Sequence, residues 1–425
     1  MVIFRLFVKY TQFFLTFVFM RFNFVSLTVC AVLLSAVGGC RMHPETGRST
    51  IPAVERILGD PDCREAKILA AFDPRNTQGD IVLIDNPERC FALSEALVKC
   101  DARDNIDGTP GPDFLPDFAG ERITTLIDLQ YPPYARFLEA ENSDALREVS
   151  VRAVISALDT ACCLGPFDHE FRSSKPVAKL LVVSSPYMTA YGGFDIDTLF
   201  RSSGVRVPVV SATEVMMQQA LSSREGAVLF GMLSDRTTAA SGVYQNVFRN
   251  LARKRGDQIS RVFCFSLPDK EEAPDSLAAA QPDLLKHVLD QYSRSGENRA
   301  LNALVVDDVS VSVESLLASY ANILNSPSDE NAYYRKLISR DFVIIDGIAA
   351  VTDACYSFLR GNNLFTHNIA YPDAKAYITS PEGGIFTLMD FEFSEIPVEL
   401  IASLEKLAPK TLSLYVQDQH KARGN

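Results

Sequence analysis

The residues of this sequence best suited to chemistry follow short apolar runs, at the points where strands would end. They supply hydroxyls, carboxylates and one guanidinium: Asp128, Ser184, Ser185, Tyr187, Asp235, Arg236 and Asp307. An Asp–Arg pair can hold a polar ligand through two parallel hydrogen bonds, and a tyrosine offers an apolar ring with a hydroxyl. This set predicts the binding of a small polar, hydroxylated ligand.

Each of these positions also has a structural interpretation. A serine nucleophile would need a neighbouring base and a strained turn such as G-x-S-x-G, and neither is visible around Ser184 or Ser185. Asp235 and Arg236 can equally form a local salt bridge, and the residues after Asp128 can equally form a structural turn. The sequence therefore assigns no catalytic residue.

The stretch "ALVVDDVSVSVES" (303–315) resembles a phosphoribosyl diphosphate site, in which an apolar strand and two acids precede a phosphate-binding loop. Asp307 and Asp308 fit the acids. The following loop has no glycine, so its backbone cannot approach a phosphate closely. The alternative is that both aspartates end a strand and cap the next helix.

Metal and redox sites are not indicated. The five histidines are scattered, and no cysteine pair has zinc spacing with histidine, so we expect no metal and no cofactor. Cys264 and Cys355 lie in apolar elements and are predicted to be buried free thiols. One disulfide among Cys63, Cys90 and Cys100 is compatible with an oxidising compartment.

The elements that must position these residues alternate along the chain. After two earlier strands at 66–73 and 80–86, a helix at 87–100 and a loop at 101–121, we expect strands at 122–129, 178–186, 205–212, 226–233, 259–267, 301–308 and 341–347. Helices are expected at 143–163, 195–204, 211–221, 239–255, 281–294, 311–324 and 348–360. Such alternation predicts an α/β fold of doubly wound parallel sheets with helices on both faces, in two Rossmann-like lobes. The carboxyl ends of the strands would then share one edge.

The predicted organisation has five parts. Residues 1–39 form a signal peptide, 40–60 a tether, 61–210 the first lobe, 211–395 the second lobe, and 396–425 a C-terminal helix and tail. The net charge of −12 argues against nucleic acid as a partner, because phosphate binding requires a basic surface.

The segment "MRFNFVSLTVCAVLLSAVGGC" (20–40) resembles a bacterial lipoprotein signal, with Val37-Gly38-Gly39-Cys40 as its lipobox. The resemblance implies that Cys40 receives lipid, becomes the mature N-terminus and anchors the chain to a bilayer, facing the periplasm or the outside. Residues 1–19 would be dispensable, because Met20 opens a complete signal. The alternative is an uncleaved anchor at 11–39, although Arg21 makes it a poor span.

Three stretches resemble type I periplasmic binding proteins: "FRSSGVRVPVVSA" (200–212), "VLFGMLSDRTTAASGVYQNVFRNLARKRG" (228–256) and "NALVVDDVSVSVESLLASYANIL" (302–324). The resemblance implies a ligand held between two lobes for uptake or sensing, and an inner-membrane transporter as a further partner. Two alternatives stay open: an extracytoplasmic hydrolase or transferase, and a structural envelope lipoprotein without a ligand.

Overall fold

The structure is a computed structural model that describes residues 48–163, 171–268, 277–368, 370–379 and 385–387. The chain divides into two units, Met1–Ser49 and Thr50–Asn425, and every helix and strand below lies in the second unit. The predicted signal peptide, Cys40 and the tail at 396–425 lie outside the described residues.

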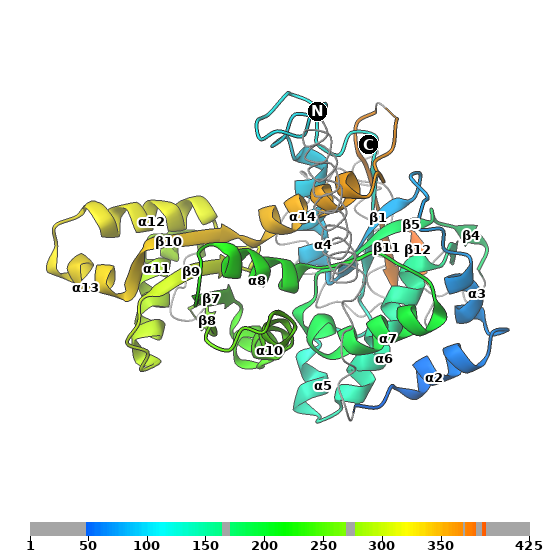
Figure 1. Cartoon of the computed structure of the whole chain (residues 1–425), viewed down its shortest axis with the longest axis horizontal. Helices are drawn as coiled ribbons and strands as arrows, with labels where there is room; N and C mark the ends of the chain where they lie inside the picture. Colours follow the sequence, from blue (N-terminus) through cyan, green and yellow to red (C-terminus); the bar gives the residue numbers. More distant parts are fainter. Residues whose placement is uncertain (1–47, 164–170, 269–276, 369, 380–384, 388–425) are drawn as a thin grey trace, which may run out of the picture. The chain divides into compact units, whose positions relative to one another are not determined.

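The first lobe is built on a six-stranded sheet in the order β12-β11-β2-β1-β5-β6 (Figure 1). The strands are β1 (Asp80–Asp85), β2 (Arg122–Ile127), β5 (Ala178–Val183), β6 (Val209–Ser211), β11 (Asp373–Thr379) and β12 (Ile385–Thr387). All neighbours pair in parallel except β11 and β12, which pair antiparallel. A separate two-stranded pairing joins β3 (Ala161–Cys162) to β4 (Ser173–Ser174).

The second lobe is built on a four-stranded sheet in the order β10-β9-β7-β8. Its strands are β7 (Leu229–Ser234), β8 (Arg261–Ser266), β9 (Leu301–Val306) and β10 (Ile338–Asp346), and all of them pair in parallel. The α/β fold class predicted from the sequence, with parallel sheets, flanking helices and two Rossmann-like lobes, is therefore confirmed.

Helices connect and cover the strands of both lobes. In the first lobe they are α2 (Pro52–Gly59), α3 (Arg64–Ala70), α4 (Pro87–Lys99), α5 (Ala135–Glu139), α6 (Ser143–Leu158), the π-helical turn η1 (Met188–Gly192) and α7 (Gly193–Ser203). The helices that follow along the chain, most of them between strands of the second lobe, are α8 (Ala212–Ser222), α9 (Arg236–Ala240), α10 (Val243–Arg255), α11 (Leu277–Arg294), α12 (Val313–Asn325), α13 (Asp329–Leu337) and α14 (Gly347–Gly361).

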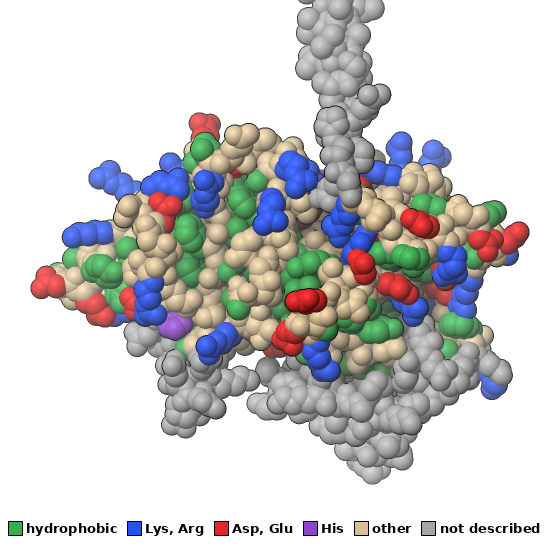
Figure 2. All heavy atoms as spheres, turned by 90° about the horizontal axis from the view of Figure 1, so that it is seen from below, with side chains coloured by type: hydrophobic (Ala, Val, Ile, Leu, Met, Phe, Trp, Pro, Cys, Tyr) green, Lys and Arg blue, Asp and Glu red, His purple; other side chains and the backbone are tan. Residues whose placement is uncertain are grey.

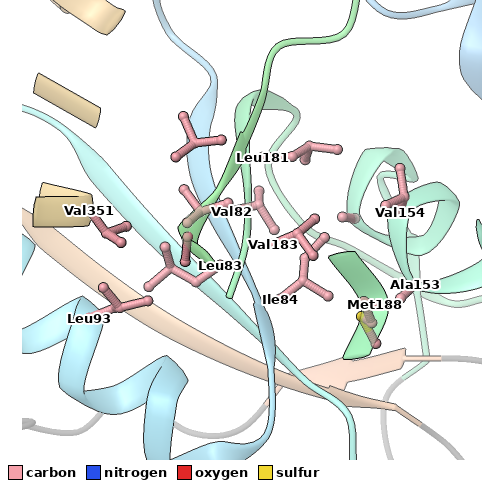
Figure 3. Close-up of a cluster of buried hydrophobic side chains, with 14 of the residues drawn as sticks. Val82, Leu83, Ile84, Leu93, Ala153, Val154, Leu181, Val183, Met188 and Val351 are labelled. Carbon is pink, nitrogen blue, oxygen red and sulfur yellow. The ribbon is translucent and has the colours of Figure 1, made fainter. Parts of the chain in front are cut away.

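The hydrophobic core of the first lobe surrounds its central strands β1 and β5, whose residues are all buried. Figure 3 shows Leu83 of β1 beside Leu93 of α4 and Val351 of α14, while Val183 of β5 lies toward Val154 of α6. Side chains alternate between the two faces of a strand, so helices on both faces bury the sheet. This rigid layer fixes the positions of the residues that follow β1 and β5.

Two predictions near the N-terminal end of the described chain were wrong. Residues 66–73 were expected to form a strand but lie mainly in helix α3, which the Cys63 side chain caps by accepting from the Ala66 N–H. The segment is rich in alanine and has one β-branched residue, a composition that favours helix. The tether predicted at 40–60 contains helix α2, whose Val54 and Ile57 are buried.

The predicted division between the lobes also needs correction. Residues 373–387 were assigned to the second lobe, but β11 pairs with β2 and extends the first sheet. Helix α14 likewise packs against α4 and α8. The chain therefore returns to the first lobe after it has completed the second, a long-range connection that local sequence patterns do not reveal.

The described cysteines from Cys63 to Cys355 are free thiols. No disulfide joins Cys63, Cys90 and Cys100. Cys355 is buried as predicted, whereas Cys264 is only partly buried on the edge strand β8. None of the helices in the described ranges is both long and apolar enough to cross a membrane.

Candidate functional site

The end of strand β1 places two charged residues together. Asp85 is the last residue of the strand and is buried. Helix α4 begins almost at once, with Asn86 as its cap, accepting from the Arg89 N–H at 3.0 Å, and Pro87 in its first position. The first turn therefore carries Arg89 back over the strand end, where its Nε lies 3.8 Å from Asp85 Oδ2.

Arg89 also reaches across to the second lobe. Its Nη1 donates to Oδ1 of Asp307, which directly follows β9. The hydroxyl of Tyr244, a fully buried residue of α10, donates to Oδ2 of the same carboxylate. Asp307 is thus held from both lobes.

Ser184 completes this group from the neighbouring strand. It follows β5 directly, and its hydroxyl lies 3.1 Å from Asp85 Oδ2 and 3.2 Å from the Ile84 carbonyl oxygen. We call the group formed by Asp85, Arg89, Ser184, Tyr244 and Asp307 the interlobe cluster. It brings together the carboxyl ends of β1, β5 and β9, the edge where open α/β sheets bind their ligands.

The interlobe cluster contains two carboxylates and one guanidinium, so its formal charge is negative. Burial raises the pKa of Asp85 to about 6. The charge of Arg89 and the hydrogen bonds from the Asn86 N–H and Ser184 oppose this rise, while the charge of Asp307 adds to it. Asp85 is therefore a buried carboxyl group that titrates close to neutrality.

Arg89 and Tyr244, two further ionisable members of the cluster, keep their protons. Burial acts to lower the pKa of Arg89, but the charges of Asp307, Tyr244 and Asp85 outweigh it and raise that pKa well above its usual value. Burial, followed by the charge of Asp307, raises the pKa of Tyr244 well above its usual value. Both side chains therefore act as hydrogen-bond donors, and Asp85 is the member suited to exchange a proton.

Tyr187 lies next to the interlobe cluster. It is buried just after β5, and its hydroxyl lies 3.5 Å from Oγ1 of Thr238 in α9 of the second lobe. Its ring packs beside Tyr134, with 6.3 Å between the ring centroids. Tyr187 therefore provides a second contact between the lobes near the ends of β5 and β7.

The structure brings three of the seven predicted ligand residues, Ser184, Tyr187 and Asp307, to this region. The other four lie outside the interlobe cluster. Asp128 accepts from Gln130 N–H, Tyr131 N–H, Tyr134 hydroxyl and Thr379 hydroxyl, and so holds its own turn. Ser185 accepts from the Met188 N–H, Asp235 caps α9 through the Thr238 N–H, and Arg236 is exposed at the start of α9.

Sequence reasoning missed Asp85, Arg89 and Tyr244. Asp85 carried a usable signal, since it ends the apolar run "DIVLID" much as Asp307 directly follows the apolar run "LNALVV". Arg89 follows Asp85 at the spacing of one helical turn. Tyr244 carried no signal, because its partner Asp307 is 63 residues away in the sequence.

A cavity of about 310 Å³ lies elsewhere in the first lobe, against α2, α3, α6 and the residues that follow β2. Asp128 and Thr379 line it. Its arginines are paired with acids, in Arg56–Glu65, Arg64–Asp159 and Arg152–Glu148. The interlobe cluster is the stronger candidate for chemistry, because it holds two carboxylates against one guanidinium at the carboxyl ends of three strands.

No group of three or more His, Cys, Asp or Glu side chains in the described ranges is arranged to hold a metal ion.

The chain matches no protein-family model. No curated protein matches it either. Among solved structures, it is similar to a glutamate racemase isoform from Bacillus anthracis, with 12% identity, a TM-score of 0.44, and 72% of this chain and 90% of that chain covered. A glutamate racemase from Thermus thermophilus in complex with beta-chloro-D-alanine matches with 12% identity, a TM-score of 0.41, and coverage of 78% and 93%.

An aspartate racemase homologue from Pyrococcus horikoshii OT3 also matches, with 11% identity, a TM-score of 0.34, and coverage of 66% and 99%. The matched structures are racemases, which corrects the prediction of a periplasmic-binding-protein-like body that captures a ligand for uptake or sensing. The geometry adds a physical reason for the correction. Ser184 and Asp307, expected to line an open cleft, bind protein groups instead.

Proposed function

We propose that this chain is an enzyme that uses Asp85 to move a proton to or from a small polar substrate. The observation that carries the proposal is the placement of Asp85, a buried carboxyl group with a pKa of about 6 at a strand end, in contact with Ser184 and Arg89. A group whose pKa lies near the working pH is best suited to general acid–base catalysis.

Arg89 would orient the substrate. A guanidinium donates several hydrogen bonds in a fixed plane and pairs well with a carboxylate. In the present arrangement Asp307 occupies this position. A substrate with a carboxylate or carbonyl oxygen would compete with Asp307 for Arg89, and this would bring the neighbouring atoms of the substrate to Asp85.

Entry of the substrate would separate contacts that join the two lobes. The Arg89–Asp307 ion pair and the Tyr187–Thr238 contact both cross between them. We propose that these contacts open together and that the substrate binds between the carboxyl ends of β1 and β9. Tyr244 would hold the Asp307 carboxylate in the second lobe while the site is open.

Deuterium exchange tests the proposal. The protein is incubated in D2O with a panel of small carboxylic acids and carbonyl compounds, and ¹H NMR detects deuterium at carbon. We expect exchange by the wild type that rises with pH through about 6, because the base form of Asp85 removes the proton. Asp85→Asn should be slower by about 10²-fold or more.

The matched control is Asp235→Asn, which alters an exposed carboxylate at the start of α9. It should exchange at the wild-type rate. Equal rates in the wild type and Asp85→Asn on a compound that the wild type labels would contradict the role of Asp85.

The location of this enzyme is a separate proposal that rests on the sequence alone. The lipobox ending at Cys40 would anchor the chain to a bacterial membrane, facing the periplasm or the outside.

A further inference from the structure

The loop after α4 exposes apolar side chains to solvent. We call residues 101–117 the aspartate loop. Within it Ile106 is 89% exposed, Phe114 92% and Leu115 52%. A fully exposed phenylalanine between two other exposed apolar residues favours a contact with another surface.

The aspartate loop is held in one shape by its own side chains. Asp101 accepts from the N–H groups of Asp113 and Phe114, at 2.9 and 3.0 Å. Asp117 accepts from the N–H groups of Ala102 and Arg103, both at 3.1 Å. Arg103 in turn pairs with Asp353 of α14. The loop therefore holds Phe114 in place outside the body of the protein.

The backbone of Phe114 gives a further indication. Its φ is +70°, in the left-handed region that bulky residues rarely adopt. Residues held in this region cost free energy, and they concentrate where a function requires them. Here the conformation holds the Phe114 ring in solvent, so no burial of the ring within this chain offsets the cost of the backbone conformation.

The aspartate loop is also strongly acidic. It contains five aspartates against one arginine, which gives a formal charge of −4. An anionic lipid surface would repel it, and a basic protein surface would attract it.

The same chain carries a surface of complementary character. We call residues 253–261, "RKRGDQISR", the basic segment. It contains four basic residues against one aspartate, a formal charge of +3. Within it Ile259 is 61% exposed, and the segment joins the end of α10 to the start of β8.

The aspartate loop and the basic segment lie on different sides of the second unit. In Figure 1 the loop that follows α4 is at the upper edge of the drawing, and α10 is in its lower half. Figure 2 views the molecule from that lower side and shows Lys and Arg side chains on the described surface. One molecule therefore cannot bring the two surfaces together.

We propose that the aspartate loop of one copy of this chain docks on the basic segment of a second copy. Phe114 and Ile106 would pack on Ile259. Asp107, which is exposed, and Asp104, which is half-buried, would face Arg255 and its basic neighbours. The contact joins two different surfaces, so each added copy keeps an unused loop or segment, and the association is head to tail. A contact made by one loop is small, so the association is weak and sensitive to salt.

Sedimentation velocity of the full-length chain tests this contact. The protein is kept in a non-ionic detergent, because residues 11–39 are strongly apolar. Runs cover a wide concentration range at about 10 mM and about 1 M salt, where the Debye length is about 30 Å and about 3 Å. We expect association at low salt that is lost at high salt.

Two variants remove the two halves of the contact. Phe114→Ser alters the loop, and the double variant Arg255→Glu/Ile259→Ser alters the basic segment. Each should lower the association constant by about tenfold or more. Leu317→Ser, at a 46% exposed position of α12, and Arg75→Glu, at an exposed position, are the matched controls and should associate like the wild type.

Mixing the two variants makes the test specific. The loop variant retains a normal basic segment, and the segment variant retains a normal loop. An equimolar mixture should therefore form a complex of two chains that grows no further. A wild type that stays monomeric at low salt, an association unchanged in both variants, or a mixture that fails to form the complex would each overturn the proposal.

Discussion

Arg89 and Asp307 belong to different lobes, and the guanidinium of one donates to the carboxylate of the other. The side chains are 15% and 3% exposed. Because both side chains are largely buried, each charge is stabilised by the other, and removal of one partner leaves the second buried without compensation. This pair therefore links the end of β1 to the end of β9 and fixes the arrangement of the interlobe cluster.

We expect Arg89→Ala to lower the free energy of unfolding by about 3–5 kcal/mol, because it leaves Asp85 and Asp307 buried without their cation. Urea unfolding at neutral pH measures the change. The control is Arg201→Ala, which breaks the Arg201–Asp197 pair on the surface, where both side chains are more than a third exposed. That change should cost about 1 kcal/mol or less. Similar losses in the two variants would contradict the importance of the buried pair.

The pH dependence of stability tests the titration of Asp85. Its folded-state pKa of about 6 lies above the ordinary aspartate value of about 3.9. Below about pH 4 both states hold the proton, so Asp85 contributes nothing. Between about pH 4 and 6 only the folded state keeps it, so stability falls as the pH rises. Above about 6 the penalty is constant, at about 3 kcal/mol.

The variant Asp85→Asn cannot titrate, so it should gain up to about 3 kcal/mol relative to the wild type between pH 4 and pH 7. Urea unfolding of both proteins across this range measures the difference, with Asp235→Asn as the control for an exposed carboxylate. Parallel profiles for the wild type and Asp85→Asn would show that Asp85 has an ordinary pKa.

The local pattern of the sequence was sufficient to predict the class of fold. Apolar runs such as 178–183 and 301–306 are strands buried on both faces, and the helices between them require parallel pairing. The same logic correctly placed Ser184 and Asp307 at strand ends. These features depend on residues that are close in the sequence.

The contacts that were not predicted join parts of the chain that are distant in the sequence. Arg89 and Asp307 are 218 residues apart, and "PERC" resembles the first turn of any surface helix. The pairing of β11 with β2 joins Asp373 to Arg122, 251 residues apart in the sequence. Asp128 was predicted to bind a ligand because it follows a strand, but its partners Tyr134 and Thr379 use its carboxylate for the fold.

Lipidation at Cys40 stays a prediction from the sequence and has a direct test. Mass spectrometry of the native protein should find a mature N-terminus at Cys40 that carries lipid, because Val37-Gly38-Gly39-Cys40 has the lipobox pattern. The variant Cys40→Ser should remain unprocessed. An intact Met1 or a mature start at another residue would exclude lipidation at this position.

Variants of Asp128 can distinguish a structural role of this carboxylate from a role in substrate binding. Its carboxylate accepts from two backbone N–H groups and from the hydroxyls of Tyr134 and Thr379, at distances from 2.8 to 3.3 Å. Asp128→Ala leaves these donors without an acceptor and should cost about 2–3 kcal/mol of stability. Tyr134→Phe removes one donor and should cost about 1 kcal/mol. In the double variant the costs should not add, because the two residues share one hydrogen bond. Urea unfolding of the four proteins measures this coupling.

If Asp128 serves the turn alone, Asp128→Ala should retain wild-type deuterium exchange under conditions where it is folded. Loss of exchange with unchanged stability would instead place Asp128 in the substrate site.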